Sequence, residues 1–139
     1  INEITSNIWK IWHETNDLSI EEDFNRGIVS MSAGDLVMAI TFFTSVIEKN
    51  SKFAEAWNKR ATVYYMMGKF DKSMLDIYET LKLEPRHFGA MDGMGLIFIQ
   101  KKEFDKAMDV YEQMLKIFPN SGSIKAKKEL MLNYISQST

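Results

Sequence analysis

Apolar and small side chains recur at steps of three and four residues along the chain, a spacing typical of amphipathic helices. Two such runs follow one another in the middle of the sequence: Trp57, Ala61 and Tyr64, then Phe70, Met74, Ile77 and Leu81. We expect a turn between them at residues 67–69, where Gly68 can take the left-handed conformation that ends many helices. A second turn is expected at Glu84 and Pro85, because proline cannot continue a helix but can begin the next one.

This two-helix pattern returns at a constant step along the chain, the step that separates Pro85 from Pro119. Five sets of positions keep the step across three units: Gly27, Ala61 and Gly95; Ala39, Ser73 and Ala107; Leu36, Phe70 and Phe104; Phe43, Ile77 and Tyr111; Ile47, Leu81 and Leu115. Gly34 and Gly68 keep it as well. A fixed period of this kind is typical of arrays in which each helix pair packs against its neighbours.

The first of these sets, Gly27, Ala61 and Gly95, holds only small residues. Where two antiparallel helices approach closely, a side chain larger than a methyl group would push them apart. We therefore expect the larger residues of the equivalent set, Phe43, Ile77 and Tyr111, to lie near this contact.

The repeated residues resemble the tetratricopeptide repeat. The resemblance is carried by Trp57, Ala61, Tyr64, Ser73, Ile77 and Pro85, and then by Met91, Gly95, Phe98, Ala107, Tyr111 and Pro119. It implies an all-α fold, a right-handed α-solenoid of antiparallel helix pairs (a TPR superhelix), forming a single domain over residues 1–139. The implied repeats span residues 20–53, 54–87 and 88–121, after an N-terminal half-repeat helix at 1–19 and before a capping helix at 122–139. Residues 57–60 and 84–88 are also similar to a small group of bacterial tetratricopeptide proteins.

The first repeat departs furthest from the family pattern. Asp23 stands where tryptophan is usual, and Ser51 replaces the closing proline. Across the three repeats, a position that usually holds leucine is occupied by Arg26, Arg60 and Met94. In the capping helix, we expect the lysines and Glu129 to face outward.

Composition excludes several classes of function. Seventeen basic and nineteen acidic side chains give a net charge of −2, which lacks the positive surface that nucleic acids require. The absence of cysteine excludes disulfides, a thiol nucleophile and a zinc ribbon. No apolar stretch approaches the roughly 20 residues that cross a bilayer, so we expect no membrane span. The sequence begins at Ile1, so we expect its natural start to lie upstream. It fits the cytoplasm, or the periplasm if a leader has been removed.

No group of residues indicates catalysis, a cofactor or a metal site. His13 and His87 stand far apart in different units, with no carboxylate at ligand spacing, so we expect ordinary surface or interhelix roles for both. Gly93 and Gly95 lack the third glycine and the preceding strand of a phosphate-binding loop. We predict that the chain is not an enzyme.

Stacked helix pairs form a superhelix whose concave surface is lined by the first helix of each pair. The family resemblance implies that four positions of each first helix face this groove. The candidate groove residues are Phe24, Ile28, Met31, Asn58, Thr62, Tyr65, Asp92, Leu96 and Ile99. The apolar members form a strip that suits an amphipathic helix or an extended peptide, and Asn58 and Asp92 could hold a peptide backbone by hydrogen bonds. Such a strip marks an interaction site unless the chain's own end helices cover it.

We therefore expect a protein-interaction module that binds a peptide or helix of a partner protein. Family members that clamp the acidic tails of chaperones use lysine, arginine and asparagine at five positions. Here those positions hold Phe24, Ile28, Lys59, Gly89 and Gly93, and shifting by one repeat does not restore the pattern. An acidic tail is therefore not the expected ligand. The alternative function is structural, a homo-oligomer in which Trp9, Trp12 and the first repeat pack against another copy.

Overall fold

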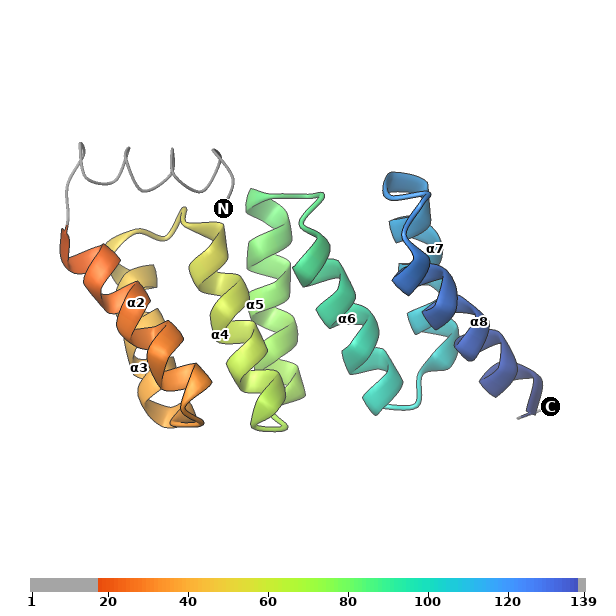
Figure 1. Ribbon diagram of the computed structural model, residues 1–139, viewed down its shortest axis with the longest axis horizontal. Helices are drawn as coiled ribbons and strands as arrows, with labels where there is room; N and C mark the ends of the chain where they lie inside the picture. The colour runs from red at the N-terminus through yellow and green to blue at the C-terminus, as the bar shows by residue number, and fades with distance from the viewer. Residues whose placement is uncertain (1–17, 138–139) are drawn as a thin grey trace.

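The computed structural model describes residues 18–137 as seven α-helices that follow one another along a single array (Figure 1). The helices are α2 (Leu18–Ser32), α3 (Leu36–Lys49), α4 (Ala54–Met66), α5 (Phe70–Leu83), α6 (Phe88–Gln100), α7 (Phe104–Ile117) and α8 (Gly122–Gln137). Within these residues there is no β-strand. None of the described helices is long and apolar enough to cross a membrane.

The helices lie in two layers, with α2, α4, α6 and α8 on one side of the array and α3, α5 and α7 on the other (Figure 1). Each helix packs against the next one along the chain, and α4 also contacts α2 and α6. The predicted half-repeat helix at 1–19 lies outside the described residues, except that Leu18 and Ser19 begin α2. Trp9 and Trp12 are outside as well, so self-assembly through them stays a prediction.

The turns within the helix pairs use a left-handed residue at one repeated position. Gly34 and Gly68 have φ angles of +82° and +75°, and Lys102 occupies the third equivalent position with a φ of +59°. The Gly68 backbone N–H donates to the carbonyl of Tyr65 at 2.9 Å, which satisfies part of the end of α4. The turn predicted at residues 67–69 is therefore confirmed. Helix α5 ends at Leu83 and α6 begins at Phe88, so the turn predicted at Glu84 and Pro85 is confirmed too.

The small residues of the first helices allow large side chains of the second helices to lie against their backbone. A Cβ atom added to Gly27 would lie 2.5 Å from Cε1 of Phe43. One added to Gly95 would lie 2.7 Å from the ring of Tyr111. Both distances are too short for real atoms, so the expected close contact is confirmed in the outer two pairs. In the middle pair, the corresponding Ala61 and Ile77 share one core cluster.

The last helix covers α7 with a narrow apolar side. Ile124 and Met131 are fully buried, and Tyr134 stacks on Phe104. Glu129 is exposed, as expected, although it stands one repeat step after Gly95 in the set of small residues. The expectation that all the lysines face outward is wrong for Lys127, which turns inward and pairs with a carboxylate of α6.

Candidate functional site

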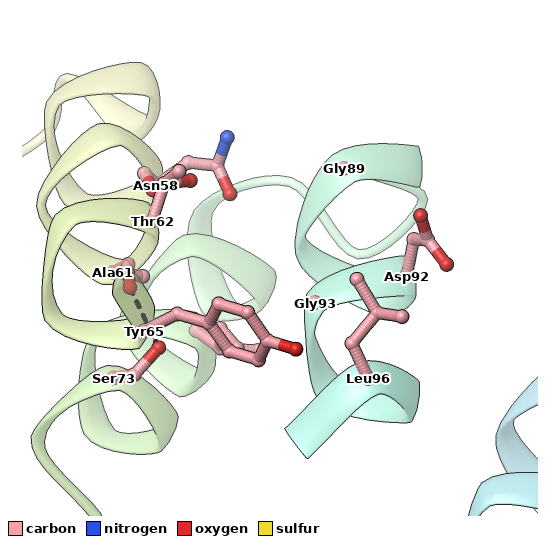
Figure 2. A pocket seen from close by; sticks show the side chains of 10 residues that line it. Asn58, Ala61, Thr62, Tyr65, Ser73, Gly89, Asp92, Gly93 and Leu96 are labelled. Carbon is pink, nitrogen blue, oxygen red and sulfur yellow. Dashed lines mark hydrogen bonds between the residues drawn. The ribbon is translucent and has the colours of Figure 1, made fainter. Parts of the chain in front are cut away.

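A pocket of about 130 Å³ opens between α4 and α6, with α5 behind it (Figure 2). Its walls come from three helices: Asn58, Ala61, Thr62 and Tyr65 of α4, Ser73 and Ile77 of α5, and Gly89, Asp92, Gly93 and Leu96 of α6. It opens on the layer of first helices, which is the side where the groove was predicted.

The pocket brings together five of the nine candidate groove residues. These are Asn58, Thr62, Tyr65, Asp92 and Leu96. The ring of Tyr65 and the side chain of Leu96 reach toward one another from opposite walls (Figure 2). The spacing along the first helices therefore identified two of the three walls.

The other four candidates lie elsewhere, and the prediction for Phe24 is wrong. Phe24 is only 7% exposed, because its ring packs against Phe43 and against Phe53, which precedes α4, with centroid distances of 5.7 and 5.1 Å. Ile28 and Met31 are half-buried against the same cluster. Ile99 is half-buried against the cluster of α6, α7 and α8.

The pocket exists because the middle pair lacks the large ring that its neighbours carry. Phe43 and Tyr111 lie against glycines in the outer pairs, whereas the middle pair has the shorter Ile77 at this position. Helix α6 widens the space further, because Gly89 and Gly93 are one helical turn apart and both line the pocket. A side chain at Gly93 would enter the pocket, and its Cβ would lie 3.3 Å from Cδ1 of Ile77.

The Ser73 and Thr62 hydroxyls that line the pocket both donate to carbonyl oxygens of the protein itself. The Ser73 hydroxyl donates to the Ala61 carbonyl at 2.7 Å (Figure 2), and the Thr62 hydroxyl donates to the Asn58 carbonyl at 3.0 Å. The remaining inner surface comes chiefly from carbon atoms of Ile77, Leu96 and the Tyr65 ring. An apolar group can therefore enter without breaking a hydrogen bond.

One rim of the pocket is fixed by a network between the starts of α4 and α6. Glu55 accepts hydrogen bonds from Asn58 Nδ2 at 3.0 Å and from His87 Nε2 at 3.3 Å. The Nδ1 atom of His87 accepts from the Ala90 backbone N–H at 3.0 Å and caps α6. The neutral ring with its proton on Nε2 serves both contacts, so His87 has the interhelix role predicted for it.

This network shifts the ionisation of its two titratable groups. The hydrogen bond to Glu55 raises the pKa of His87 above its ordinary value, against the opposing effect of burial. The same hydrogen bond lowers the pKa of Glu55, again against burial. The Glu55 carboxylate is therefore ionised at neutral pH, and Lys59 lies close enough to contribute to the lowered pKa.

The opposite rim is tied to α8. Asp92 Oδ1 accepts from Lys127 Nζ at 2.7 Å, and both side chains are partly buried. The Tyr65 hydroxyl accepts from Gln100 Nε2 at 3.2 Å. Asn58 and Asp92, expected to hold a peptide backbone, thus each have an internal partner.

The arrangement can enclose an apolar group but offers no reactive set. Within residues 18–137, no three histidine or acidic side chains are close enough to hold a metal ion. His87 caps a helix, and the Ser73 hydroxyl donates its proton to a carbonyl oxygen. His13 lies outside the described residues.

Reasoning from the first helices missed the floor of the pocket, Ser73 and Ile77, and the residues Ala61, Gly89 and Gly93. The sequence did indicate the pocket in one place: in the set Phe43, Ile77 and Tyr111, the member from the middle pair is the smallest. The glycines of α6 gave a second signal, since glycine inside a helix is unfavourable without a packing reason.

Comparisons with known proteins agree with this architecture. The family model of the tetratricopeptide repeat matches residues 90–121. A TPR repeat-containing protein of Rhizobium etli is 40% identical over 81 residues, which cover 58% of this chain and 40% of that protein. The Hsp70-Hsp90 organizing protein 1 of Glycine max is 30% identical over 86 residues, 62% of this chain and 15% of that protein. The chain thus spans less than half the length of these relatives.

Solved structures show the same fold at low sequence identity. The first TPR domain of Spaghetti (RPAP3), bound to the HSP90 peptide SRMEEVD, superposes with a TM-score of 0.78 at 17% identity, covering 86% of this chain and 97% of that one. The Sgt2 TPR domain from Aspergillus fumigatus gives a TM-score of 0.76 at 19% identity, covering 86% and 80%. With its regularly repeated helix pairs, this right-handed α-solenoid is a tetratricopeptide repeat protein.

Proposed function

We propose that this chain is a non-catalytic protein-interaction module that binds a segment of a partner protein across α4 and α6. The observation that carries the proposal is the pocket that opens on the layer of first helices, with an apolar interior and with the Ser73 and Thr62 hydroxyls bonded within the protein. The Spaghetti domain, which has the same fold, holds a peptide in its solved structure.

The shape of the site supports a peptide segment as the ligand. Leu96 and Tyr65 stand at the mouth of the pocket and remain partly exposed, so a segment lying across them would bury apolar surface. The glycines of α6 carry no side chains that would keep a backbone away from that helix. The match in fold and the shape of this site together favour a peptide over a small molecule.

A peptide-display selection against the immobilised chain tests the proposal, followed by measurement of Kd for the selected peptides. Leu96→Asp places a charge at the mouth of the pocket and should weaken binding by about tenfold or more, because the carboxylate would lose water on contact with an apolar segment. Circular dichroism checks that the helices are retained.

Leu75→Asp is the matched control. Leu75 is a helical leucine that is 64% exposed, and it stands two residues from Ile77 on the opposite side of α5. The same change of leucine to aspartate should leave Kd unchanged there. Failure to select any peptide, or equal weakening by both variants, would refute the proposal.

A further inference from the structure

We infer that the pocket between α4 and α6 anchors one aliphatic side chain, such as leucine, isoleucine or methionine, from a partner segment that carries no acidic group around that residue. The inference rests on the proposed function and adds the chemistry of the ligand, which the family resemblance does not supply. It follows from the size of the pocket, its walls and the charges at its rim.

The size limits the anchor to one side chain. A closed apolar cavity of about 150 Å³ holds a benzene molecule. The pocket here is slightly smaller, at about 130 Å³, and is open on one side toward the partner. A branched aliphatic side chain fits this space, and the larger indole ring fits it less well.

The walls favour an aliphatic group over a polar one. Ser73 and Ile77 of α5 form the floor. Leu96 and the Tyr65 ring form facing sides. Ser73, the polar residue of the floor, already donates its hydroxyl proton to Ala61. A hydroxyl, amide or charged group placed against this floor would give up water without gaining an equivalent partner there.

The charges of the rim disfavour an acidic segment. Asp92 is paired with Lys127, and Glu55 has His87 and Lys59 near it. Glu84 shares His87 with Glu55, so among the described residues of this rim no surplus of cations is left to hold an acidic tail. The segment that complements this rim therefore carries no acidic group next to its anchor residue.

Nuclear magnetic resonance titration of the ¹⁵N-labelled chain tests the inference with defined probes. These are N-acetyl-leucine methylamide, its glycine and tryptophan counterparts, and the acidic heptapeptide SRMEEVD. The leucine probe should shift the amide signals of residues 61, 77, 93 and 96 and bind about tenfold or more tightly than each of the others.

Two variants that fill the pocket provide the decisive comparison. Ile77→Phe combined with Ala61→Gly copies the pair Phe43 and Gly27 of the first repeat, so the new ring has a known way of packing. Gly93→Leu fills the same space from α6, where the nearest atom is the flexible end of Ile77. Each folded variant should lose the shifts caused by the leucine probe, while the outward Leu75→Asp variant keeps them.

The inference is supported if the leucine probe shifts only the signals of pocket residues and these shifts vanish in the variants that fill the pocket. Equal binding of the glycine, tryptophan or acidic probe overturns it, and so do shifts that persist in both filled variants. A third outcome separates the two proposals: display-selected peptides bind the wild type, Leu96→Asp weakens their binding, and the variants that fill the pocket bind them as tightly as the wild type. This outcome supports the proposed function and refutes the aliphatic anchor.

Discussion

In the pair α6/α7 the ring of Tyr111 lies against Gly95, whereas in the pair α4/α5 the equivalent positions hold Ile77 and Ala61. The Tyr111 ring fills the interior of its pair at a cost in free energy, because its hydroxyl is buried with no hydrogen-bond partner among residues 18–137. Burial also raises the pKa of this hydroxyl. The shorter Ile77 leaves a pocket instead. Two pairs built on one pattern thus differ in whether their interior is closed or opens into a pocket.

The two pairs differ at a second place. Arg60 of α4 forms a bidentate ion pair with Asp76 of α5, with two N···O distances of 2.8 Å. The equivalent positions of the next repeat hold Met94 and Val110, which are both apolar. The α4/α5 pair therefore depends on a buried charge pair where its neighbour depends on apolar packing.

Removing one partner of the ion pair should have the largest effect. Asp76→Val leaves the Arg60 guanidinium partly buried without its carboxylate, so the free energy of unfolding should fall by about 3–5 kcal/mol. The double variant Arg60→Met/Asp76→Val copies the α6/α7 pair and should unfold at a urea concentration close to that of the wild type. A single variant as stable as the wild type would show that the ion pair contributes little.

A substitution at the close contact between Gly95 and Tyr111 should have the second-largest effect on stability. Gly95→Ala places a Cβ 2.7 Å from the Tyr111 ring and should lower the free energy of unfolding by about 1–3 kcal/mol, although alanine favours helix. In a Tyr111→Ile background the same change should be neutral or stabilising, because the ring is gone. A double-mutant cycle measures this coupling, and zero coupling would contradict the contact.

A substitution in a turn within a helix pair should have a smaller effect, and it should stabilise the protein. Lys102 has a φ of +59°, whereas the equivalent turn of the α4/α5 pair has Gly68. A left-handed conformation costs an ordinary residue about 1–2 kcal/mol, so Lys102→Gly should raise the free energy of unfolding by up to about that amount. Gly68→Lys, measured by the same urea titration, should lower it. A loss of stability in Lys102→Gly would mean that the lysine side chain stabilises the turn.

The smallest effect concerns His87, which joins the starts of α4 and α6. Because its hydrogen bond to Glu55 raises its pKa, the ring should titrate above the ordinary value of 6.5 in an NMR experiment, and Glu55→Gln should lower the midpoint. A raised folded-state pKa means that the associated stability is complete below the ordinary pKa and is lost as the pH rises through the folded-state pKa. A midpoint below the ordinary value would show that the cap on Ala90, which needs an unprotonated Nδ1, dominates.

The helices and their turns were predictable because they depend on local periodicity. The constant repeat step located both helices of each pair, and the small residues Gly27 and Gly95 correctly indicated where rings approach a backbone. The side of α4 and α6 that faces the pocket was predictable for the same reason, since Tyr65 and Leu96 follow from helical spacing.

The rest of the site depends on contacts between residues far apart in the sequence. Phe24 could not be recognised as core from its own helix, because its ring packs against Phe43 of α3 and against Phe53 in the connection before α4. The partners of the rim, His87 for Glu55 and Lys127 for Asp92, come from 32 and 35 residues away. The spacing of residues along a single helix does not predict pairs that lie this far apart in the sequence.

The most direct measurement is an isotope-filtered nuclear Overhauser experiment on a display-selected peptide bound to the chain. Ile77 forms the floor of the pocket, so its δ1 methyl group should show cross-peaks to the methyl groups of one aliphatic residue of the peptide. Cross-peaks confined to Leu75 or other residues on the outer side of α5, with none to Ile77 or Leu96, would contradict binding in this pocket.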